Sequence, residues 1–111
     1  MDKKLRREAL TEYRERKVYP GIFALHCDPA GQIWVGKAPD LATIENRMRF
    51  MLSSGSVAQP EFKSAIEAYG PDVFRFEELE RLEPDLTPMA RDTELKSRLA
   101  HWAEKLGART I

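Results

Sequence analysis

The chain contains a single cysteine, Cys27, and only two histidines, His26 and His101, among its 111 residues. A lone thiol excludes an intrachain disulfide and a metal site built from several cysteines. The histidines are too far apart in the sequence for the His-x-x-x-His spacing of a helical metal site. No apolar run approaches the ~20 residues that cross a bilayer, and the first residues lack the apolar stretch of a secretory signal. We therefore expect a soluble, cytoplasmic domain with no membrane contact.

A net charge of one sign is also missing. Eighteen Lys and Arg residues balance eighteen Asp and Glu residues, so no overall basic excess indicates a nucleic-acid-binding protein. The distribution is less even, because segment 1–17 carries +3, segment 64–90 carries −5 and segment 91–111 carries +2. Basic ends and an acidic middle permit one surface that attracts a charged partner. The alternative is that these charges simply lie on solvated helix surfaces.

Apolar spacing and turn residues divide the chain into helices and strands. Residues 1–17 predict an N-terminal amphipathic helix. We expect this helix to pack on the remainder, residues 18–107, so that the chain forms a single domain. Strands are expected over 18–27, 32–36 and 73–82, the first two as a hairpin, and helices over 41–52, 60–69 and 89–106. This order predicts an α/β domain of the α+β type, with three short strands and about four helices.

Two triplets on the expected hairpin are distinctive, because each combines a glycine with an aromatic residue. Gly21-Ile22-Phe23 lies on the first strand and Trp34-Val35-Gly36 on the second. Since strand side chains alternate between faces, the glycine and the ring of each triplet share a face. Two rings beside two glycines predict a shallow concave patch that a ligand backbone can approach. Ordinary core, with glycines for close packing, is the alternative.

At these triplets the sequence resembles the GIY-YIG nuclease superfamily, in particular its small stand-alone bacterial members. Gly21-Ile22-Phe23 stands where the family has Gly-Ile-Tyr, and Trp34-Val35-Gly36 where it has Tyr-Ile-Gly. The resemblance covers about residues 18–106 and implies a GIY-YIG-like three-stranded antiparallel sheet flanked by helices. It also implies metal-assisted hydrolysis of DNA phosphodiesters, with a divalent metal that is usually magnesium.

The resemblance further implies four key side chains: two tyrosines, an arginine that stabilises phosphate charge and a glutamate that holds the metal. Phe23 and Trp34 replace the tyrosines, and neither ring offers a hydroxyl. Ile44 stands at the arginine position and Leu99 at the glutamate position. The site is therefore expected to be divergent.

Other side chains are candidates to replace the missing groups. Arg47 lies one helical turn beyond Ile44, where a guanidinium can bind phosphate bidentately. Glu78 shares strand parity with Phe74 and Phe76, which makes it the candidate replacement carboxylate. An ordinary surface or core role is the alternative for each candidate. The catalytic candidates are Phe23, Trp34, Arg47 and Glu78, and the nucleic-acid-binding candidates are Gly21, Gly36, Lys37, Arg49, Arg98 and His101.

Three functions remain open at this level. The first is a divergent GIY-YIG endonuclease that acts on DNA with magnesium. The second is an inactive nuclease-fold module that binds nucleic acid, and the third is a domain that binds a protein partner. Metal-dependent turnover identifies the first, whereas steep salt sensitivity of binding separates the second from the third.

Overall fold

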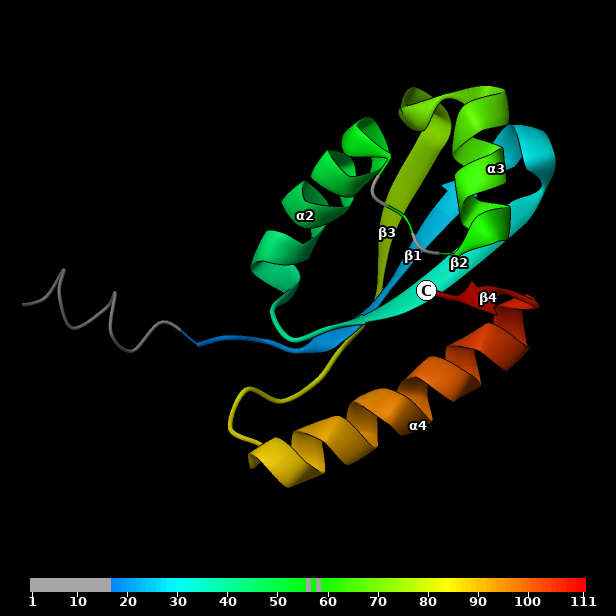
Figure 1. Ribbon diagram of the computed structural model, residues 1–111. Coiled ribbons are helices and arrows are strands. Elements are labelled where there is room, and N and C mark those ends of the chain that lie inside the picture. Colours follow the sequence, from blue (N-terminus) through cyan, green and yellow to red (C-terminus); the bar gives the residue numbers. More distant parts are fainter. Residues whose placement is uncertain (1–16, 56, 58) are drawn as a thin grey trace, which may run out of the picture.

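The computed structural model describes residues 17–55, 57 and 59–111, so the helix expected over residues 1–17 lies outside the described part except for its last residue. A four-stranded sheet carries helices on both faces (Figure 1). The strands are β1 (Gly21–Cys27), β2 (Gln32–Ala38), β3 (Phe74–Arg81) and β4 (Arg109–Thr110), and the helices are α2 (Leu41–Ser54), α3 (Pro60–Tyr69) and α4 (Pro88–Leu106). In this part of the chain, no helix has both the length and the apolar character that a membrane span requires.

The sheet has the order β3-β1-β2-β4, with β1 in the middle. β1 pairs antiparallel with both β2 and β3, which confirms the expected three-stranded antiparallel sheet. All seven residues of β1 are buried, as a central strand covered on both faces requires. β4 adds two residues parallel to β2, with Trp34 opposite Arg109. The sequence did not predict β4, because two residues are too few to show an alternating pattern.

The helix ends follow the capping signals in the sequence. Asp40 caps α2 by accepting a hydrogen bond from the backbone N–H of Ala42 at 2.9 Å. Gly55 and Gly107 end α2 and α4 in the left-handed conformation, with φ of 72° and 60°. β1 begins at Gly21 rather than at residue 18. Pro20, just before it, has no N–H to donate to a neighbouring strand, although its carbonyl still accepts from the N–H of Leu82 at 2.8 Å.

Two apolar clusters hold the helices on the sheet. On one face, α2 and α3 pack on a larger cluster that includes Phe23, Leu25 and Trp34. On the other face, α4 packs Leu95 against Ile22 and Leu82. Figure 1 shows this arrangement, with α2 and α3 on one side of the sheet and α4 on the other. Any site on the sheet must therefore lie at an end or an edge that the helices leave open.

Candidate functional site

Phe23 and Trp34, the two rings expected to line a concave patch, fill the core instead. Their exposed fractions are 2% and 0%. Phe23 stacks on Phe76 with ring centroids 5.6 Å apart. Trp34 packs against Phe62 at 4.9 Å and Phe74 at 5.9 Å. As placed, neither ring reaches solvent, so neither can contact a substrate.

The two glycines serve close packing rather than ligand approach. A Cβ added at Gly36 would lie 2.5 Å from Cζ of Phe23, which is the residue directly opposite on β1. A Cβ added at Gly21 would lie 2.6 Å from Cδ1 of Leu41 and would also overlap the backbone oxygen of Glu80. The concave patch expected from the triplets is therefore absent, because neighbouring side chains and backbone occupy the space beside both glycines.

The positions aligned with the family's arginine and glutamate are separated by the sheet. Ile44 is buried in the cluster beneath α2 and α3. Leu99 packs against the cluster beneath α4, on the opposite face. Both are apolar packing residues, and no active site can form between them through the sheet.

Glu78 belongs to a polar cluster at the end of β3. It lies directly opposite Phe23 in the β1–β3 register. Arg81 donates to both of its carboxylate oxygens, from Nε at 2.9 Å and from Nη2 at 3.3 Å. The guanidinium of Arg81 also lies 5.0 Å from the ring centroid of Tyr19. The hydrogen bonds and charge of Glu78 raise the pKa of Arg81. We call Tyr19, Glu78 and Arg81 the β3-end cluster.

The donor set around Glu78 does not fit a magnesium ion. Both carboxylate oxygens already accept from Arg81, and a cation at this place would face the guanidinium charge. Over residues 17–55, 57 and 59–111, no three His, Cys, Asp or Glu side chains are grouped so that they could hold a metal. We therefore derive no metal-dependent step at this cluster.

Arg47 lies on the exposed side of α2, beside an exposed aromatic ring. Phe50, one helical turn further on, is 73% exposed. A hollow of about 450 Å³ is lined by Asn46, Arg47, Met48, Phe50 and Met51, and we call these residues the α2 surface. The sequence pattern does not single out Phe50, since the apolar stripe of the helix runs through Met48 and Met51. Arg49 instead anchors α2, because it donates to the backbone carbonyl of Phe74 at 2.7 Å.

Arg98 is held by a carboxylate that the sequence analysis did not single out. Glu80 accepts from Nε of Arg98 at 2.7 Å and from Nε1 of Trp102 at 2.8 Å. Burial acts to raise the pKa of the Glu80 carboxyl, but the hydrogen bonds from Trp102 and Arg98 outweigh burial and lower this pKa. His101 and Lys37 are both exposed. Arg98 thus links α4 to β3, and the nucleic-acid-binding candidates do not gather into one surface.

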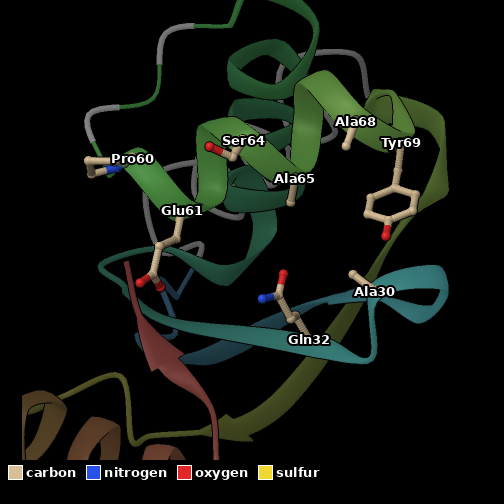
Figure 2. A pocket seen from close by; sticks show the side chains of 8 residues that line it. All are labelled: Ala30, Gln32, Pro60, Glu61, Ser64, Ala65, Ala68 and Tyr69. Atoms are coloured by element: carbon tan, nitrogen blue, oxygen red, sulfur yellow. The ribbon is translucent and has the colours of Figure 1, made fainter.

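A second hollow lies between α3 and the turn that joins β1 to β2 (Figure 2). Its volume is about 440 Å³. Gln32 projects into it from β2, and Tyr69 extends its ring from the end of α3 toward the β1–β2 turn. Ser64 and Glu61 line it from α3. No local sequence pattern predicts this hollow, because its lining comes from segments more than 25 residues apart.

Solved structures with a similar fold are known. The chain is similar to the catalytic domain of the homing endonuclease I-TevI, with a TM-score of 0.66 and 20% identity over 83% of this chain and 97% of that chain. An alanine variant of the same intron endonuclease domain gives a TM-score of 0.65 and 19% identity, over 80% and 84% of the two chains. No protein-family model and no curated protein sequence matches the chain. Because I-TevI is a GIY-YIG endonuclease, the fold is GIY-YIG-like, as the triplets predict.

Proposed function

We propose that the protein is a nuclease-fold module that binds DNA through the α2 surface and acts in the cytoplasm. The observation that carries the proposal is the exposed pair of Arg47 and Phe50 on α2. The likeness to an endonuclease catalytic domain supports a nucleic-acid substrate. Under this proposal the protein does not use the tyrosine and magnesium chemistry that the family resemblance implies, because the corresponding positions are filled by core residues.

The α2 surface has the two kinds of group that bind unpaired nucleic acid. An exposed aromatic ring stacks on bases whatever their sequence, and this stacking contributes about 1–3 kcal/mol per base. A guanidinium beside the ring binds the phosphate backbone bidentately. Phe50 and Arg47 are one helical turn apart, so both side chains can reach neighbouring nucleotides. Asn46, on the same surface, adds an amide that can donate and accept hydrogen bonds.

The salt dependence of DNA binding tests this proposal. We expect labelled single-stranded DNA to bind the wild-type protein, with an affinity that falls steeply between about 50 mM and about 200 mM salt. Arg47→Ala should weaken binding and reduce the slope of log K against log salt by about one. Fluorescence anisotropy titrations measure both quantities.

Arg91→Ala is the matched control, since Arg91 is a partly exposed arginine on α4, across the sheet from α2. It should bind DNA as the wild type does. Equal affinity and equal salt slope for Arg47→Ala and the wild type would contradict a role for the α2 surface.

The β3-end cluster favours a second candidate function, a rearranged endonuclease site. Tyr19 supplies a phenol whose ring lies 5.0 Å from the Arg81 guanidinium, and Arg81 supplies a group that can bind phosphate. Because the cluster does not fit a metal ion, this candidate predicts nicking of supercoiled plasmid DNA that needs no added magnesium or manganese and persists with EDTA. Glu78→Gln should then abolish nicking while Glu83→Gln, an exposed carboxylate on the following loop, preserves it. Plasmid that stays supercoiled under all these conditions would exclude this candidate and leave the binding module.

A further inference from the structure

Phe50 has the most exposed aromatic ring in the part of the chain that the structure describes. It is 73% exposed, and the other exposed Phe, Tyr or Trp side chain of this part, Tyr69, is 44% exposed. No carboxylate lines the hollow beside the Phe50 ring, whose other lining residues are Asn46, Arg47, Met48 and Met51. A polyanion can therefore approach the ring without meeting a negative charge inside the hollow.

Arg47, one helical turn before Phe50, has an exposed guanidinium without a protein partner. Over residues 17–55, 57 and 59–111, the other six arginines each form an ion pair or a hydrogen bond, and they are Arg49, Arg75, Arg81, Arg91, Arg98 and Arg109. An arginine that already has a partner must share it or give it up before it binds phosphate, whereas Arg47 gives up only water. The α2 surface thus places a free guanidinium beside the most exposed ring.

These two groups respond differently to paired and unpaired DNA. A guanidinium binds the phosphate backbone, which single strands and duplexes both present. An apolar ring binds the flat faces of bases, and those faces are free only where the bases are unpaired. In a duplex each base stacks on its neighbours, so the ring must first unstack or flip a base. That step costs free energy and offsets the gain from stacking.

We propose that the α2 surface selects unpaired strands over duplex DNA. Phe50 is the residue that makes the selection, and Arg47 is a contact that both forms of DNA share. This inference rests on the DNA-binding function proposed above and adds the form of DNA that the surface takes. The substrates are then single-stranded regions, gaps and displaced strands, where bases are unpaired and the phosphate backbone is continuous with them.

The affinities of one labelled strand, alone and annealed to its complement, test the selection. The strand is chosen without self-complementarity, and fluorescence anisotropy with the full chain gives the ratio of single-strand to duplex affinity. For the wild type this ratio should be about ten or more. Phe50→Ala should bring the ratio close to unity, whereas Arg47→Ala should weaken binding to both forms and keep the wild-type ratio. Phe50→Trp, which retains an aromatic ring, should also keep the ratio.

Tyr69→Ala is the matched control, because it removes the other exposed ring from a hollow whose lining includes no arginine. It should bind both forms of DNA as the wild type does. A wild-type ratio close to unity, or a Phe50→Ala protein that keeps the wild-type ratio, would overturn the selection. If both forms bind equally and Arg47→Ala weakens both, only the selection fails. If neither form binds, the proposed function itself fails.

Discussion

The Phe23 ring fills the volume beside Gly36, in the middle of the sheet. The ring lies over the glycine of the neighbouring strand, where any side chain larger than hydrogen would overlap it. The same ring stacks on Phe76 with centroids 5.6 Å apart, so a shift of the Phe23 ring away from position 36 disturbs this contact. The Gly-aromatic pattern therefore has a packing cause in this protein.

Gly36→Ala should destabilise the fold by about 1–3 kcal/mol, because an added methyl overpacks the core beside Phe23. Phe23→Leu, which shortens the side chain, should offset part of that loss in the double variant. Urea unfolding of the two single variants and the double variant measures the coupling. A Gly36→Ala protein as stable as the wild type would show that the ring moves away at no cost.

At this scale the sequence predicted the correct residues and the wrong surroundings. Alternation along each strand places Phe23 and Trp34 with their glycines on one face, and the structure agrees. The alternation does not predict how far each ring reaches across to the next strand or which helix covers the ring. Burial of Trp34 beneath α3 depends on Phe62, a contact that no local pattern contains.

Strand β3 carries carboxylates that face different partners. Glu77 lies 3.2 Å from Nε2 of His26, Glu78 pairs with Arg81, and Glu80 pairs with Arg98. Strict alternation would place Glu78 and Glu80 on one face. A register shift beside Ile22 and Phe23 instead places Glu80 opposite Ile22, under α4. Such an irregularity adds a residue to one strand, and the alternating pattern gives no sign of it.

The Glu80 contacts predict a pH-dependent attachment of α4. Because the pKa of Glu80 is lowered in the folded protein, its contribution to stability is present above the ordinary value of 4.5 and is lost as the pH falls through the lowered pKa. Glu80→Gln should lower the free energy of unfolding near neutral pH by about 1 kcal/mol. The free energies of unfolding of Glu80→Gln and the wild type should become equal in acid.

Chemical denaturation at a series of pH values measures this difference, with Glu83→Gln as the exposed control. The control should follow the wild type at every pH. A constant gap between Glu80→Gln and the wild type from neutral pH into acid would show that the carboxylate charge plays no part.

Over the whole molecule, the element order was predictable and the proposed DNA-binding surface was not. Caps and turn residues such as Asp40, Gly55 and Gly107 fixed the helix ends closely, and the triplets indicated the GIY-YIG-like fold. The surface depends on which side chains remain outside once the helices pack. In the sequence, Phe50 is one more apolar residue of α2. Only the packing of the helix on the sheet shows that Phe50 stays exposed beside Arg47.

The most direct test of the proposed function is the affinity of single-stranded DNA for two double variants at one salt concentration. Arg47→Ala with Phe50→Ala removes the phosphate contact and the stacking ring together, and should weaken binding by about tenfold or more. Arg91→Ala with Met89→Ala removes a partly exposed arginine and an exposed apolar side chain from α4, and should bind as the wild type does. Equal weakening by both pairs, or by neither, would contradict a DNA-binding surface on α2.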